Sequence, residues 1–495
     1  MSDQQSSYRQ IMKATSLFGG VQVFNIFISI IRSKFIAVLL GPTGMGIAGL
    51  LTSTTGLISG LTNFGLGISA VKNVAAANSS GNQTLIAIIF TVLKRCVWVT
   101  GLLGMIVTIV TAPLLSRITF GNSEYTFPFI WISVSLLMTQ LSSGQMILLQ
   151  GMRKLQYLAK ANLAGSILSL IITVPLYYLF GIKGIVPAII VASLTTLAGS
   201  WYFARKIEIE KVTVSKARIL AEGKGMMTMG FIISLSNLIY LGASYIVRVF
   251  ISNHGGVDQV GLYNAGFVII NSYVGLIFTA MATDYYPRLS AVAHSNFECM
   301  KVINQQAEIA ILIMAPIIIL FIVFIRWIVI VLYSTMFVPV NEMILWAALG
   351  MLFKAVSWAI AFIFLAKGAS RLFFWSELIA NIYTLILNLL GYYYFGLKGL
   401  GISFLAGYLI YLIQVIIIAF KKFEFKIHTG MYIIFCVQLT LTLLSFLPAI
   451  LLGHKISYII GSVMFLISLF YSYKELDKRL GIRLIITNLK IKYKK

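Results

Sequence analysis

Residues 178–185, Tyr-Leu-Phe-Gly-Ile-Lys-Gly-Ile, and residues 393–400, Tyr-Tyr-Phe-Gly-Leu-Lys-Gly-Leu, are nearly identical in sequence although they lie half a chain apart. Their glycines, Gly181 and Gly396, are separated by 215 positions in a chain of 495 residues. In each stretch the dipeptide Phe-Gly lies between two apolar runs, which predicts a tight turn between helices. The same turn is therefore predicted twice.

A second pair of stretches has the same spacing. Residues 41–47, Gly-Pro-Thr-Gly-Met-Gly-Ile, are loosely similar to residues 256–262, Gly-Val-Asp-Gln-Val-Gly-Leu. Gly46 and Gly261 are again 215 positions apart. One such match could arise by chance, whereas two matches at one offset indicate an internal repeat.

The composition identifies the environment of this repeat. Hydrophobic residues make up 59% of the chain, charged residues only 11%, and the mean hydropathy is +0.94. The apolar residues form long blocks such as Ile309–Ile325 and Met431–Leu452. Because about 20 apolar residues cross the ~30 Å hydrocarbon layer as a helix, we predict an all-α polytopic membrane protein. The first apolar run, Leu17–Leu40, is too long for a signal peptide and is expected to be the first span.

About fourteen transmembrane helices are predicted. They are expected at 17–40, 45–70, 84–113, 125–148, 159–180, 184–204, 226–252, 260–284, 307–332, 342–366, 372–396, 398–420, 429–452 and 456–473.

The positive charges predict the orientation of these spans. With a cytoplasmic N-terminus, the inner segments hold 26 Lys and Arg residues and the outer loops hold four. This asymmetry is what the positive-inside rule expects, so both termini are predicted to be cytoplasmic. The net charge of +24 then belongs mostly to a rim that faces anionic lipids, and nucleic acid is not expected as a partner.

The repeat predicts the domain organisation. Residues 1–210 and 226–422 are expected to form two pseudo-symmetric six-helix lobes, joined by a basic cytoplasmic linker at 211–225. Residues 423–495 add two helices and a basic tail. Six is an even number, so both lobes enter the membrane from the same side. This is the parallel repeat of secondary transporters, which hold substrate between the lobes and alternate between two open states.

Five basic residues are predicted to lie at depth within the spans, where a cation is costly. These residues are Arg32, Lys34, Arg248, Arg326 and Lys354. Two interpretations stay open: the side chains reach the outer surface along their aliphatic stems, or they line a cationic cavity that binds an anion. Acids are scarce, and four of them, Asp284, Glu308, Glu342 and Glu377, are expected at helix ends. Buried cations without buried acids favour an anionic substrate.

No metal or cofactor site is predicted. The three cysteines and four histidines are isolated in the sequence, and a phosphate-binding GxxxxGK[ST] loop is absent. No cofactor is therefore expected, and the choice between H+ and Na+ as a coupling ion stays open.

The stretch from Arg32 to Ile47, Arg-Ser-Lys-Phe-Ile-Ala-Val-Leu-Leu-Gly-Pro-Thr-Gly-Met-Gly-Ile, resembles the first helix and loop of O-antigen (Wzx-type) flippases. These flippases, which are also called lipopolysaccharide biosynthesis translocases, belong to the multidrug/oligosaccharidyl-lipid/polysaccharide (MOP) exporter superfamily. The resemblance runs over about residues 8–422. Further matching stretches are Gly121-Asn, Gln150-Gly-Met-Arg-Lys, Val260-Gly-Leu-Tyr, Tyr286-Pro-Arg-Leu-Ser, Arg326-Trp, Leu365-Ala-Lys-Gly-Ala-Ser-Arg and Ser376-Glu-Leu.

The resemblance implies two lobes in a V around a cationic cavity, in the bacterial inner membrane. It implies that undecaprenyl-diphosphate-linked oligosaccharide moves from the cytoplasmic to the periplasmic leaflet, with other polysaccharide assembly proteins as partners. The five cations named above are the implied substrate-binding residues. The implied charge or gate residues on the cytoplasmic side are Lys367, Arg371, Glu377 and Arg153. Many members of the family have twelve helices, so the last two helices depart from the pattern.

Three other functions remain as alternatives. A multidrug exporter of the same superfamily is disfavoured because it generally needs a buried acid. A polyprenyl-linked glycan polymerase or glycosyltransferase is disfavoured because the outer loops are under about 15 residues and hold no paired carboxylates. A flippase for the peptidoglycan precursor lipid is separated from the first function by resemblance alone.

Overall fold

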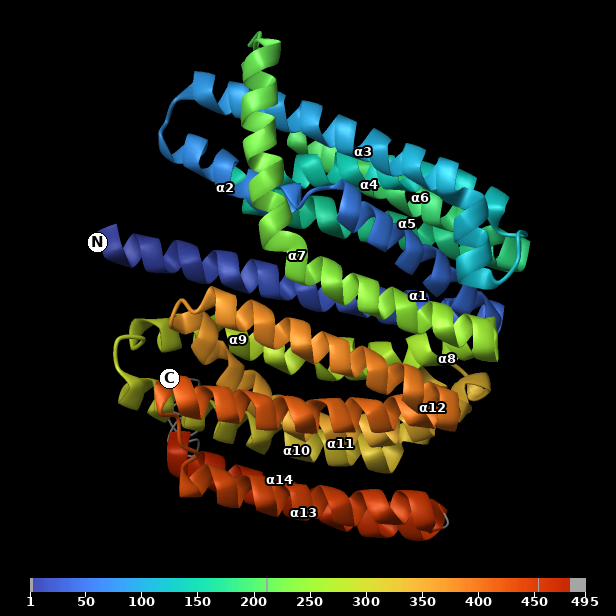
Figure 1. Cartoon of the computed structure of the whole chain (residues 1–495), viewed down its shortest axis with the longest axis vertical. Coiled ribbons are helices and arrows are strands. Elements are labelled where there is room, and N and C mark those ends of the chain that lie inside the picture. Colours follow the sequence, from blue (N-terminus) through green and yellow to red (C-terminus); the bar gives the residue numbers. More distant parts are fainter. Residues whose placement is uncertain (1–2, 211, 453, 481–495) are drawn as a thin grey trace, which may run out of the picture. The chain divides into compact units, whose positions relative to one another are not determined.

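The computed structural model describes residues 3–210, 212–452 and 454–480, and in these ranges all regular structure is helical (Figure 1). The elements are α1 (Asp3–Thr62), α2 (Leu66–Ser79), α3 (Gln83–Phe120), α4 (Thr126–Gly151), α5 (Leu155–Phe180), η1 (Gly181–Gly184), α6 (Ile185–Ala204), α7 (Lys216–Gly255), α8 (Val257–Val268), η2 (Ile269–Val274), α9 (Leu276–Ala291), α10 (Asn296–Leu332), η3 (Thr335–Val340), α11 (Asn341–Ala366), α12 (Ser370–Phe423), α13 (Thr429–Leu451) and α14 (His454–Leu480).

Eleven helical stretches of the described residues are long and apolar enough to cross a membrane. Three of them, of 39, 50 and 54 residues, contain two crossings each, since about 20 residues suffice for one. Each of these three is broken near its middle, at Gly41 in α1, at Gly181 between α5 and α6, and at Gly396 in α12. The prediction of an all-α polytopic fold with about fourteen membrane helices is confirmed.

The repeated turns have the same backbone conformation. Gly181 has φ 54° and ψ −133°, and Gly396 has φ 58° and ψ −141°. Gly41 (φ 65°, ψ −167°) and Gly256 (φ 86°, ψ 170°) form the second pair. Only glycine adopts these angles without strain, so the two copies share their turns because they share these glycines.

The chain forms two compact units, each with its own contacts. The first comprises the chain through Gly261 with the short segment Leu332–Ser334. In it α3 packs on α4, α5 packs on α6, and α4 packs on α6. Its core includes Leu93, Val97 and Leu148.

Helix α7 belongs to this first unit, where it contacts α1, α2 and α3. Figure 1 shows α7 bent: its first part crosses α2 and α3, and the rest follows α1. The helix begins at Lys216, inside the predicted linker, because the Ser215 hydroxyl caps it by accepting from the Arg218 amide at 3.3 Å. The lobe boundaries drawn from the repeat stay a prediction.

The second unit holds Leu262–Val331 and the chain from Thr335 onward. Helix α11 packs on α12 and on α9, and α13 packs on α14. Its core includes Tyr285, Ile303 and Phe364. The predicted span 260–284 is interrupted by the π-helical turn η2, an irregularity that frequently marks functional sites.

Candidate functional site

Arg32 lies on α1 in the first unit and reaches α5. Its Nη2 donates to the Ser169 hydroxyl at 2.9 Å, and the Tyr177 side chain is close enough to interact electrostatically. Its Nε is buried without a hydrogen-bond partner in the described part of the chain. A buried donor left unsatisfied costs about 1–3 kcal/mol, so this guanidinium retains capacity to bind an acceptor.

The two other predicted cations of the first unit make backbone contacts. The Lys34 ammonium donates to the carbonyl of Tyr333, in the segment Leu332–Ser334 of this unit, at 2.6 Å. Arg248 folds back along α7, where its Nη1 donates to the carbonyl of Ser244 at 3.0 Å and to the Ser244 hydroxyl. Both side chains are half-buried.

Lys354 lies on α11 in the second unit, surrounded by neutral groups. Its ammonium donates to the side-chain oxygen of Asn271, in the π-helical turn η2, at 3.0 Å. Three aromatic rings face the same nitrogen, those of Phe278, Phe404 and Tyr408, at 5.8, 5.7 and 5.1 Å from their centroids. Ring faces stabilise a cation without neutralising its charge.

Tyr408 connects Lys354 to Glu377. The rings of Tyr408 and Tyr411 lie 6.4 Å apart, and the Tyr411 hydroxyl donates to the Glu377 carboxylate. Glu377 is half-buried near the start of α12. The predicted gate acid and the predicted substrate cation therefore belong to one aromatic cluster of the second unit.

The remaining predicted site residues lie nearer the surface. Lys367 is half-buried at the C-terminal cap of α11, whereas Arg371, Arg153 and Arg326 are exposed. Arg153 has a positive φ of 55° in the turn between α4 and α5. The roles assigned to all nine residues stay predictions.

The expectation that Glu308 lies at a helix end is wrong. Helix α10 starts at Asn296, eleven residues before the predicted start, because the Ser295 hydroxyl accepts from the Glu298 amide at 3.3 Å and Cys299 and Ile303 bury one face. Glu308 is buried within this helix. The predicted span began too late because the first three turns of α10 are amphipathic.

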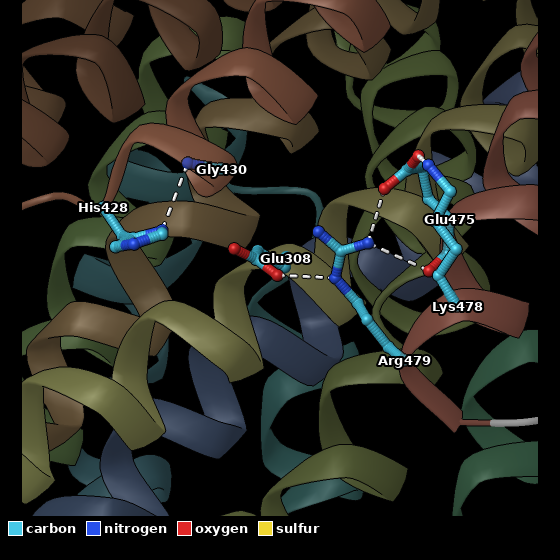
Figure 2. Close-up of polar contacts among 6 residues, drawn as sticks. All are labelled: Glu308, His428, Gly430, Glu475, Lys478 and Arg479. Carbon is cyan, nitrogen blue, oxygen red and sulfur yellow. Dashed lines mark hydrogen bonds and ion pairs between the residues drawn. The ribbon is translucent and has the colours of Figure 1, made fainter.

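Figure 2 shows how the charge of Glu308 is compensated. Arg479 of α14 donates through Nε to Glu308 at 2.7 Å and through Nη1 to Glu475 at 2.5 Å. Lys478 also contacts Glu475, at 2.7 Å. His428 accepts from the Gly430 amide at 3.2 Å at the start of α13. This cluster attaches α14 to α10, and it leaves Glu308 paired with an arginine.

The sequence motif around Gly41 and Gly256 contains a contact that was not anticipated. The Thr43 hydroxyl donates to Asp258 at 2.5 Å, and these residues are themselves 215 positions apart. A Cβ on Gly46 would lie 2.0 Å from the carbonyl oxygen of Val257, and a Cβ on Gly261 would lie 1.9 Å from that of Pro42.

These contacts are related by the repeat, because Pro42 and Val257 have the same offset as Gly46 and Gly261. We call Thr43, Asp258, Gly46 and Gly261 the symmetric contact. It joins the middle of α1 to the start of α8 within the first unit. The equal spacing of the two motifs was the signal that could have predicted it.

A family model described as "Polysaccharide biosynthesis protein" matches residues 11–293. The chain belongs to the polysaccharide biosynthesis protein family. A Shigella flexneri protein named "Putative O-antigen transporter" is 25% identical over 312 residues, which cover 60% of this chain and 72% of the relative.

The fold of this chain is similar to that of solved membrane transporter structures. The lipid II flippase MurJ in an inward closed conformation has a TM-score of 0.68 at 13% identity, covering 94% of this chain and 99% of MurJ. An inward-facing multidrug resistance MATE transporter of the MOP superfamily has a TM-score of 0.66 at 14% identity, covering 81% and 94%. The family match and the O-antigen transporter relative support the resemblance inferred from the sequence, and the solved structures confirm the fold.

Proposed function

We propose that this multi-pass membrane protein is a flippase for undecaprenyl-diphosphate-linked oligosaccharide in the bacterial inner membrane. The observation that carries the proposal is that Arg32 and Lys354 are held by neutral groups. Other cations of the described residues form ion pairs, among them Arg288, Lys398, Lys478 and Arg479. The charges of Arg32 and Lys354 therefore remain available to an anion.

A diphosphate would use the two cations differently. The guanidinium of Arg32 can bind two phosphate oxygens through parallel N–H groups. The ammonium of Lys354 is a compact point charge that can turn toward a phosphate from its aromatic surroundings. The sugars would follow the diphosphate across the membrane while the prenyl chain stays in lipid.

Alternating access requires helix ends to separate, and the symmetric contact is our candidate for that step. With Cys96, Cys299 and Cys436 replaced by serine, we expect oxidation of the Thr43→Cys/Asp258→Cys pair to arrest transport and reduction to restore it. A Thr43→Cys/Arg117→Cys pair, whose members no described contact joins, is the control. Full transport by the cross-linked pair would refute separation at this contact.

Orientation is part of the proposal. With both termini cytoplasmic, an alkaline-phosphatase fusion after Lys495 should be inactive and one in the loop Gly181–Gly184 should be active. Outward movement of a diphosphate would then release about 2.3 kcal/mol per charge at 100 mV, inside negative. Flipping in proteoliposomes should accelerate when valinomycin and a potassium gradient impose this potential.

The multidrug exporter is the second candidate, and Glu377 is the observation that favours it. A half-buried carboxylate hydrogen-bonded by a tyrosine can exchange a proton, which drug exporters require. If the protein exports cationic drugs, Glu377→Gln abolishes this efflux, and the protein restores no surface polysaccharide in a flippase-null strain, the exporter function is correct and the flippase proposal fails.

Complementation separates the two flippase substrates. We expect the protein to restore surface polysaccharide in an O-antigen flippase-null strain and not to support growth of cells depleted of the peptidoglycan-precursor flippase. Growth of the depleted cells without polysaccharide in the null strain would assign the peptidoglycan precursor instead. Membrane protein levels are measured in both strains, so that an absent protein is not scored as an inactive one.

A further inference from the structure

A cavity of about 820 Å³ lies between α3 and the first part of α7 in the first unit. Its walls are mainly apolar and include Val99, Leu220, Met227 and Phe231. Val99 is 59% exposed and Leu220 is 75% exposed, so the cavity is an open groove. Its volume falls within the ~300–1,000 Å³ typical of small-molecule sites, which suits a lipid rather than a protein segment.

The groove exists because α7 crosses the neighbouring helices at glycines. A Cβ on Gly230 would lie 2.4 Å from the carbonyl oxygen of Phe64, and one on Gly65 would lie 2.0 Å from that of Gly230. Two turns earlier, a Cβ on Gly223 would lie 2.8 Å from the sulfur of Cys96. The backbones approach at these points, and the larger side chains beside them form the walls.

Three cations line one part of this groove. Arg95 comes from α3, and Lys216 and Lys224 come from α7. The lining residues include no acid. All three cations are exposed, so phosphate oxygens could reach them from outside.

The cations lie toward the start of both helices. On α3, Arg95 precedes Val99 by one turn. On α7, Lys216 and Lys224 precede Phe231, and the exposed Leu220 lies between the two lysines. The rings of Phe64 and Phe231, 6.3 Å apart, line the apolar part. A ligand that matches this order has an anionic head beside the start of α7 and an apolar chain directed along the helices.

We propose that this groove binds an anionic phospholipid of the surrounding membrane, with its phosphate on Arg95, Lys216 and Lys224 and an acyl chain between α3 and α7. Charge complementarity favours this occupant over a neutral lipid. Each Lys or Arg close to an anionic lipid contributes about fivefold in affinity. The bound lipid would stabilise the crossing of α7 over α3. This structural role is distinct from transport of the substrate.

The test is native mass spectrometry of the purified full-length protein titrated with phosphatidylglycerol or phosphatidylcholine. We expect phosphatidylglycerol to bind at least tenfold more tightly. The triple variant Arg95→Gln/Lys216→Gln/Lys224→Gln should lose about 100-fold of that affinity. The matched control, Lys421→Gln/Lys422→Gln/Lys426→Gln, removes the same charge from exposed positions of the second unit and should change it less than threefold.

A second variant, Val99→Trp/Leu220→Trp, fills the groove and leaves its cations in place. It should also lose phosphatidylglycerol if the acyl chain lies there. Equal loss in the two triple variants, equal binding of phosphatidylcholine, or wild-type binding by the tryptophan variant would each overturn the proposal.

The lipid that copurifies distinguishes the sources of the phosphate. We expect the mass of a phospholipid, and the mass of a polyprenyl diphosphate at this site would assign the groove to the transported lipid instead. Size-exclusion chromatography verifies that every variant is folded. Because this is an equilibrium measurement on purified protein, its failure would leave the flippase proposal intact.

Discussion

Arg32 and Lys354 are both cations within membrane helices, yet their surroundings differ. Arg32 contacts the Ser169 hydroxyl and keeps one buried nitrogen without a partner among the described residues, whereas Lys354 is held by an amide oxygen and three ring faces. The repeat does not relate them, because the offset of 215 places Val247 opposite Arg32 and Thr139 opposite Lys354. The two copies share their glycine turns, including Lys183 and Lys398 in one of them, but they do not share Arg32 and Lys354. The symmetry of the repeat therefore lies in the turns, and these two membrane cations depart from it.

The largest effect is expected when the charges of both Arg32 and Lys354 are removed. The variant Arg32→Gln/Lys354→Gln should lose more than about 1,000-fold of its flipping rate, since losing one partner of a hydrogen-bonded charge pair costs about 2–5 kcal/mol. Surface polysaccharide in a flippase-null strain, normalised to inserted protein, gives the readout. Arg117→Gln, an exposed charge of α3, is the control. Normal polysaccharide from the double variant would refute a cationic cavity.

Two single substitutions separate the effect of side-chain geometry from the effect of charge. Arg32→Lys keeps the charge but loses the planar fork, so we expect flipping to fall about 10- to 30-fold. Lys354→Gln should fall further than Arg32→Lys, because it removes charge and not geometry. Initial flipping rates in proteoliposomes measure both, and equal rates for the two variants would show that geometry and charge contribute alike.

The shared backbone predicts equal effects in the two copies. Gly181→Ala and Gly396→Ala meet no atom within 4 Å of the added Cβ, so the cost is backbone strain alone. Each should lower stability by about 1–3 kcal/mol. Thermal unfolding in detergent tests this, with Gly56→Ala as a helical control in open space. A large difference between the two variants would contradict the equivalence of the turns.

The smallest expected effect concerns the aromatic surroundings of Lys354. Tyr408→Leu removes one ring face, worth about 0.5–1 kcal/mol, and should reduce flipping about two- to fivefold. Tyr408→Phe keeps the ring and should retain most of the rate. If the two substitutions behave alike, the hydroxyl rather than the ring face matters at this position.

Much of the fold could be predicted from local sequence, since apolar blocks of about 20 residues are sufficient to identify membrane helices. The glycine turns could also be predicted from local sequence. The positive φ angles at residues 181 and 396 favour glycine whatever distant residues are nearby. The start of α10 was missed because its first turns are amphipathic, and the apolar run begins only later.

The surroundings of the site were much less predictable. Ser169 and Arg32 are separated by 137 residues, and Asn271 and Lys354 by 83. Nothing in a serine or an asparagine within an apolar helix indicates which distant cation it will contact. The depth of a cation can be estimated from its helix, but its partners depend on how the helices pack.

The pair formed by Glu308 and Arg479 has a consequence for the synthesis of the chain. The two residues are 171 positions apart, so at about 5–20 residues per second the arginine emerges roughly 10–35 s after the glutamate. During that interval α10 carries an acid without this partner, and a buried charge in that condition costs about 3–5 kcal/mol. We infer that α10 settles into its final position only after α14 has been made, and a chain ending at Leu452 should be degraded unless it also carries Glu308→Gln. The last helix thus supplies the charge that makes the burial of Glu308 favourable.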